Sequence, residues 1–138
     1  MTSVPMLRVY PATKLANIDT IRLWQEWYPK ELFFHARWLR HVEMGTPDIP
    51  ENAEEFWLED EEDVKSADAV VVFAKPEQHL RGALVECGIA LANDIPLFVI
   101  GNHPDFGTWQ YHPGVTRVAD IADVVRRAHF IAAKRRGL

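Results

Sequence analysis

The chain has 138 residues, of which 48% are hydrophobic and 25% are charged, and its formal net charge is -5. This length and composition are typical of a single globular domain, and they argue against a disordered protein or a chain of two domains. The acidic balance, without interleaved basic and aromatic residues, argues against a nucleic-acid polymer as the partner.

The first half of the chain predicts two strands with a helix between them. The run Leu7 to Tyr10 is β-branched and aromatic and stops at Pro11, as a first strand would. Apolar residues at helical spacing follow between Ala16 and Leu32. The run Phe33 to Leu39 predicts a second strand, and a loop rich in Gly, Pro and Thr follows it over Met44 to Asn52.

The second half predicts three helices and three strands. In order they are a helix over Ala53 to Ala67, a strand over Asp68 to Ala74, a helix that begins between His79 and Gly82, a strand over Pro96 to Gly101, a strand over Val115 to Ala119 and a helix over Asp120 to Arg136. The valines of the strand at Asp68 do not alternate with polar residues, which indicates burial on both faces. The basic run in the last helix complements the negative end of a helix dipole and needs no partner.

Alternation of helices with such strands predicts a parallel sheet that is covered on both faces. We therefore expect one domain, residues 1–138, with a flavodoxin-like (Rossmann-like), doubly wound α/β sheet of about five parallel strands. Ligands of such sheets bind beyond the carboxyl ends of the strands, near a switch in strand order. The loop after the strand at Asp68 carries the next helix to that edge.

That helix contains one carboxylate, Glu86, among mostly small neighbours at helical spacing such as Gly82, Ala83 and Ala90. Glu86 has two interpretations. If the helix begins near Gly82, the carboxylate can simply complement the positive end of the helix dipole. If it begins near His79, that benefit is small, and a nucleophile or base held over a cleft is the better explanation.

The segment "SADAVVVFAKPEQHLRGALVECGIALANDIPLFVIG", residues 66–101, resembles the nucleoside 2-deoxyribosyltransferases and their relatives, the nucleoside 5′-monophosphate N-glycosidases. The segment "RVYPATKL", residues 8–15, is similar to the first strand and substrate loop of that family. The resemblance implies that Glu86 attacks C1′ of a small-molecule nucleoside or nucleotide, that the base leaves, and that water or a second base resolves the glycosyl ester. It also implies a homodimer and no cofactor.

The resemblance implies a second acid eight residues before Asp68, which is Asp60. This acid would help the base to leave. The surrounding run Glu59 to Asp63 makes the register ambiguous, so Asp63 is the other candidate. Both acids can also belong to a solvated helix face.

Substrate-binding residues are expected on the two loops at the carboxyl edge. Tyr10 matches an aromatic residue that lies by the sugar and the nucleophile in the family, although it can also be a core residue. Thr13 and Lys14 follow it, and Gly82 belongs to the motif of the nucleophile helix.

One position departs from the family, because Leu80 stands where the transferases carry an acid and the monophosphate hydrolases a serine. The 5′ end of a substrate must then be held differently. Arg81 and His79 flank Leu80 and are candidates for contacting a phosphate.

Aromatic and histidine residues elsewhere are further candidates for the rim of the site. The loop Asn102 to Gly114 contains His103 and His112, which lack further ligands at a zinc-like spacing, so we expect no metal. His112 is instead a candidate substrate contact, with Trp109 or Tyr111 for stacking on a base. Trp38, at the end of the predicted second strand, is a similar candidate, with core packing as the alternative.

Two other classes of protein remain open. The first is a binding module of the same fold that senses a nucleotide derivative and has lost the chemistry. The second is a relative of the cytokinin-activating phosphoribohydrolases, although the glycine-rich stretch of those enzymes is absent here.

The single cysteine, Cys87, is predicted to be a small buried hydrophobic residue. The sequence has neither a signal-like start nor a long apolar run, which predicts a cytoplasmic protein without membrane contact.

Overall fold

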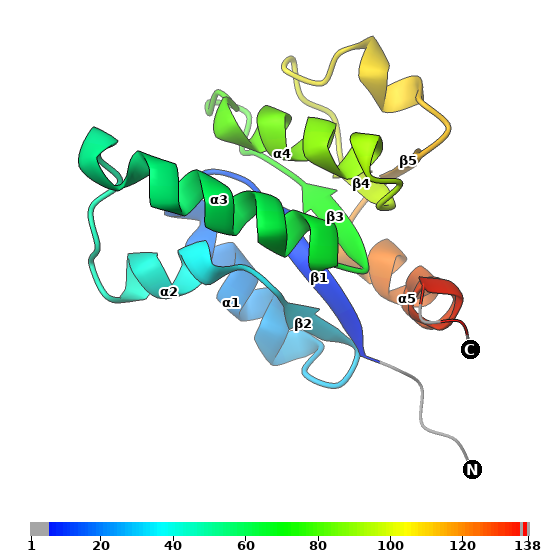
Figure 1. The fold of residues 1–138 in the computed structure, drawn as a ribbon. Helices are drawn as coiled ribbons and strands as arrows, with labels where there is room; N and C mark the ends of the chain where they lie inside the picture. The colour runs from blue at the N-terminus through cyan, green and yellow to red at the C-terminus, as the bar shows by residue number, and fades with distance from the viewer. Residues whose placement is uncertain (1–5, 136, 138) are drawn as a thin grey trace.

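In the computed structural model, which describes residues 6–135 and 137, the chain forms one sheet of five parallel strands (Figure 1). The strand order is β2-β1-β3-β4-β5, so the predicted flavodoxin-like doubly wound sheet is confirmed. The strands are β1 (Leu7–Ala12), β2 (Leu32–Phe34), β3 (Ala69–Val72), β4 (Leu97–Ile100) and β5 (Val115–Val118).

Helices cover both faces of this sheet. They are α1 (Ile18–Trp27), α2 (Arg37–Glu43), α3 (Pro50–Ser66), α4 (Gly82–Ala92) and α5 (Ile121–Arg135), with short 3-10 turns η1 (Leu15–Asn17) and η2 (Thr108–Tyr111). Helices α3 and α4 lie side by side over one face, and α1 and α5 lie over the other (Figure 1). Arg136, the predicted end of the last helix, lies outside the described residues. Within the described residues, no helix has both the length and the apolar character needed to cross a membrane.

The core lies between the helices and the central strands. Val70, Val71 and Val72 of β3 are completely buried, because this strand has a layer of helices on each side. Cys87 of α4 is also buried and free of any disulfide, as expected of a small hydrophobe.

The first strand is longer than predicted, because it continues through Pro11 to Ala12. Proline lacks a backbone N–H group, so a strand tolerates it only where no neighbouring strand has a carbonyl that requires this donor. The carbonyl of Val9 accepts a hydrogen bond from His35 just after β2, whereas the carbonyl of Ala12 accepts one from Phe73 after β3. Since backbone groups alternate in direction along a strand, Pro11 faces the side on which β2 has already ended.

The second strand was predicted to run to Leu39, and this prediction is wrong. Strand β2 ends at Phe34, and residues 37–43 form helix α2. The backbone N–H of Arg37, the first residue of α2, donates to the carboxylate of Asp63 at 2.8 Å. A helix start must satisfy its free N–H groups, and here the acceptor comes from α3, which local sequence does not reveal.

Candidate active site

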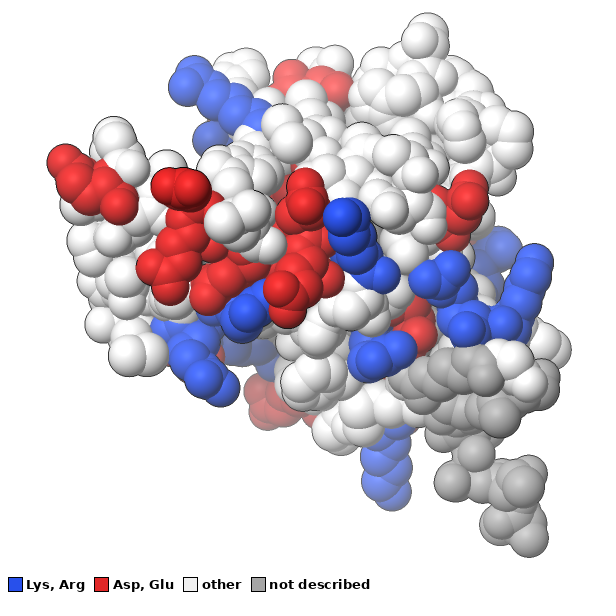
Figure 2. Space-filling model, viewed as in Figure 1, with Lys and Arg blue, Asp and Glu red and all other residues white. Residues whose placement is uncertain are grey.

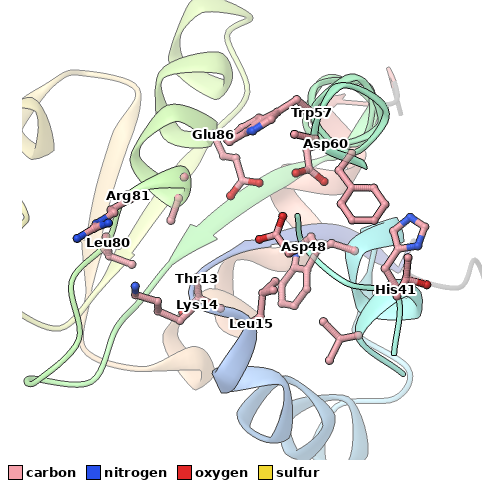
Figure 3. Close-up of a pocket in the computed structure, with 17 residues that line it drawn as sticks. Thr13, Lys14, Leu15, His41, Asp48, Trp57, Asp60, Leu80, Arg81 and Glu86 are labelled. Atoms are coloured by element: carbon pink, nitrogen blue, oxygen red, sulfur yellow. The ribbon is translucent and has the colours of Figure 1, made fainter. Parts of the chain in front are cut away.

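A cavity of about 280 Å³ lies beyond the carboxyl ends of β1 and β3, where the strand order reverses (Figure 3). Its walls are the loop after β1, helices α2 and α3, and the start of α4. Ligand pockets in proteins usually measure about 300–1,000 Å³, so this cavity is close in size to a small ligand site.

Three carboxyl groups line this cavity, Asp48 from the loop before α3 and two others from neighbouring helices. Glu86 projects from α4 and is only 6% exposed, and Asp60 projects from α3 (Figure 3). The hydroxyl of Tyr10, a fully buried residue of β1, donates a hydrogen bond to Oε2 of Glu86. Tyr10 also acts on the pKa of Asp60, which it lowers. This buried residue therefore influences both carboxyl groups.

Burial raises the pKa of both Glu86 and Asp60. Desolvation raises the pKa of Glu86 to about 8, the hydrogen bond from Tyr10 opposes this rise, and the charge of Asp60 adds to it. Desolvation also raises the pKa of Asp60 to about 6, with a further contribution from the charge of Asp63. The pKa of Tyr10 is raised far above its usual value, mainly by burial. Between pH 6 and 8 the two carboxyl groups therefore hold about one proton between them.

Helix α4 begins at Gly82, the start for which the helix dipole was expected to explain Glu86. That explanation is nevertheless weak, because Glu86 is the fifth residue of α4 and the first turn contains no acidic residue. Glu86 lies in the next turn, where the benefit from the dipole has largely gone. Among the described residues, no Lys, Arg or His side chain forms an ion pair with Glu86 or Asp60. A buried carboxyl group without a compensating cation points to a functional role.

The structure separates the two candidates for the second acid. Asp60 faces the cavity, whereas Asp63 is turned away from it and is held by Arg37. The guanidinium of Arg37 donates to Asp63 at 3.1 and 3.2 Å, in addition to its backbone N–H. Asp63 thus joins α2 to α3.

Most of the predicted substrate-binding residues line the cavity. Thr13, Lys14, Trp38, Arg81 and Gly82 all lie on its walls. Trp38 does so from helix α2 rather than from a strand end, and it is 8% exposed, so it also serves the core.

The histidines of residues 102–114 lie elsewhere. His112 is not part of the cavity wall, and its Nδ1 accepts a hydrogen bond from the backbone of Gly114 at 2.8 Å. Tyr111 is exposed and packs under Arg117. His103 is buried beside Phe106. The described part of the chain has no group of three or more His, Cys, Asp or Glu side chains placed to hold a metal ion.

One wall of the cavity was missed in the sequence. It is formed by α2, the following loop and the start of α3, and its residues include His41, Val42, Thr46, Asp48, Phe56 and Trp57. The ring of His41 stacks on Phe56 with 4.4 Å between centroids, and its Nε2 hydrogen-bonds to Glu59 at 2.8 Å. The helical period of residues 53–67 already placed Phe56 and Trp57 on a helix, but nothing local placed α2 opposite them.

No protein-family model matches the chain, and no curated protein matches it.

Proposed function

We propose that this protein cleaves or transfers the N-glycosidic bond of a nucleoside or nucleoside 5′-monophosphate, with Glu86 as the nucleophile. The observation that carries the proposal is the pair of carboxyl groups, Glu86 and Asp60, that face one cavity, with Glu86 hydrogen-bonded to the hydroxyl of Tyr10. Glycosidic bonds are broken by such pairs, because one carboxylate stabilises an oxocarbenium-like centre and the other supplies a proton. The resemblance of residues 66–101 to the N-glycosidase family supports the same chemistry.

In the proposed reaction, a carboxylate oxygen of Glu86 forms a bond to C1′ as the bond between C1′ and the base nitrogen breaks. The electron pair of the broken bond goes to the base, and Asp60 gives its proton to the base. Water or a second base then attacks C1′ and loses a proton to Asp60, and Glu86 is released as a carboxylate.

This reaction needs one ionised and one protonated carboxyl group, and the raised pKa values of the pair support that state near neutral pH. Glu86 has the higher pKa of the two groups, so in the proposed reaction it loses its proton before it attacks C1′. We propose that this proton moves to Asp60 through the hydroxyl of Tyr10, which is hydrogen-bonded to Glu86.

The cavity walls suit an aromatic base on one side and a polar group on the other. Trp38, Phe56 and His41 offer ring surfaces to a base. Lys14 and Arg81 are the cations among the wall residues on the other side, and no ion pair between either of them and an acid is found in the described residues. Leu80 is buried and supplies no polar side chain.

The test is release of free base from a panel of nucleosides and 5′-monophosphates, followed by chromatography. We expect release by the wild type and a loss of about tenfold or more for Asp60→Asn, because the amide cannot deliver a proton to the leaving base. Asp63→Asn is the control. It should lower the free energy of unfolding rather than the rate of base release. If the wild type binds a nucleotide but releases no base from any of them, the protein is a nucleotide-binding module of this fold.

We also propose that the protein is a cytoplasmic homodimer. Trp57, Leu58 and Val85 of α3 and α4 are 40%, 62% and 53% exposed. Figure 2 shows an uncharged area over α4 beside the acidic side chains of α3. Exposed apolar side chains of this kind support a protein interface. Sedimentation equilibrium at micromolar concentration is expected to give twice the chain mass, and a monomer would contradict the proposal.

A further inference from the structure

Two loops form the side of the cavity that lies opposite His41 (Figure 3). The first follows β1 and contributes Thr13 and Lys14, and the second joins β3 to α4 and contributes Leu80 and Arg81. Neither loop is part of the sheet ladder, so their relative position depends on side-chain contacts.

A pair of side-chain amides joins these loops. Asn17, at the end of η1, donates through Nδ2 to Oε1 of Gln78 at 2.8 Å, and Gln78 donates through Nε2 to Oδ1 of Asn17 at 3.0 Å. Asn17 Nδ2 also donates to Oγ1 of Thr13 at 2.8 Å. Oε1 of Gln78 also accepts from the backbone N–H of Lys75 at 2.9 Å. Each amide thus binds its own loop and the opposite one.

The surroundings make this contact rigid. Asn17 is only 1% exposed, so leaving its amide without a partner would be costly. The Thr13 hydroxyl donates to the carbonyl of Phe73 at 2.6 Å, which anchors the first loop to the end of β3. On the far side, Asp105 accepts from the backbone N–H of Leu80 at 2.7 Å. The loop of residues 75–81 is therefore fixed at both of its ends.

We infer that Asn17 and Gln78 are positioning residues for substrate binding. Their amide pair keeps Lys14 and Arg81 at a fixed separation on the cavity wall, so that both can contact the part of the ligand distant from Glu86. This role rests on the proposed function. A well-oriented pair of contacts formed before binding improves affinity, because the ligand does not have to order the loops.

The test separates positioning from simple stabilisation. Gln78→Met keeps the length of the side chain and removes its hydrogen bonds, which leaves the buried Oδ1 of Asn17 without the donor from Gln78 and its Nδ2 with Thr13 alone. The double variant Asn17→Leu/Gln78→Met removes both amides, and replacing both partners by apolar groups of similar shape restores much of the stability. If the pair positions the loops, the double variant should regain thermal stability without regaining loop order.

Loop order is measured by limited trypsin cleavage followed by mass spectrometry. Arg81 precedes Gly82 and Lys14 precedes Leu15, so both loops contain a cleavable bond, whereas Lys75 precedes Pro76 and is resistant. We expect cleavage at Arg81 and Lys14 to become about tenfold faster in both the single and the double variant. With an active substrate, KM should rise about tenfold and kcat should change little, because only uniform binding is lost.

Recovery of wild-type cleavage rates and KM together with stability in the double variant would overturn the inference, as would unchanged cleavage in Gln78→Met. If no substrate is cleaved by the wild type, the proposed function fails, but the trypsin measurement still decides whether the amide pair orders the loops.

Discussion

Replacing Glu86 with glutamine is expected to abolish base release and to leave the protein folded. Glutamine keeps the shape of the side chain, and its Oε1 can still accept the hydrogen bond from Tyr10. It carries no negative charge to stabilise the developing positive charge at C1′ and cannot form the glycosyl ester. We expect a loss of at least about 100-fold in kcat/KM, which corresponds to about 3 kcal/mol of transition-state stabilisation.

The measurement is base release by purified wild type and variant at several pH values, with circular dichroism to verify folding. Glu54→Gln is a matched control, because Glu54 is an exposed residue of α3 outside the cavity. It should retain wild-type activity. Equal base release by wild type and Glu86→Gln would show that Glu86 is structural and would remove the basis of the enzymatic proposal.

The free energy of unfolding of the wild type is expected to fall as the pH rises from about 4.5 to about 8. Over this range Glu86 holds a proton in the folded protein, where its pKa is about 8, but not in the unfolded chain, where its pKa is 4.5. The folded state therefore binds more protons than the unfolded state, and stability decreases with pH. Asp60 acts in the same direction between its ordinary value of 3.8 and about 6.

Glu86→Gln isolates the contribution of Glu86. The variant should nearly match the wild type in stability near pH 4.5, where both side chains are neutral in the folded protein, and should exceed it by a few kcal/mol at pH 8.5. Urea unfolding at these two pH values measures the difference, and Glu54→Gln should follow the wild type at both. This experiment needs no substrate. A constant difference between Glu86→Gln and the wild type across the range would mean that Glu86 has an ordinary pKa in the folded protein.

The order of the elements could be predicted from the sequence, because buried valine-rich strands and helical periods are local patterns. The parallel sheet, the helix that carries Glu86 and the strand that carries Tyr10 all follow from such patterns. The exceptions depend on distant contacts. Pro11 stays in β1 because β2 ends early, and α2 begins at Arg37 because Asp63 of α3 accepts its backbone N–H.

The same distinction holds for the candidate site. Glu86 was identified because a single carboxylate in an apolar helix is unusual, and the loops after β1 and β3 were expected at the carboxyl edge of the sheet. Asp60 and Asp63 could not be told apart, since both lie in one acidic run and only the ion pair with Arg37 distinguishes them. The wall formed by His41 and its neighbours could not be predicted, because residues 37–39, where α2 begins, were predicted to be the end of a strand.

The acid pair and the ring-bearing wall come from different parts of the chain, and this has a practical consequence for engineering. Glu86, Asp60 and Tyr10 depend on α4, α3 and β1, whereas Trp38, His41 and Val42 belong to the short helix α2. Helix α2 lies outside the sheet ladder. For the proposed reaction, a library randomised at Trp38 and Val42 can therefore vary which ring is accepted, because it leaves the contacts of Arg37 and His41 with α3 intact. Glu86 and Asp60 are then expected to keep their positions.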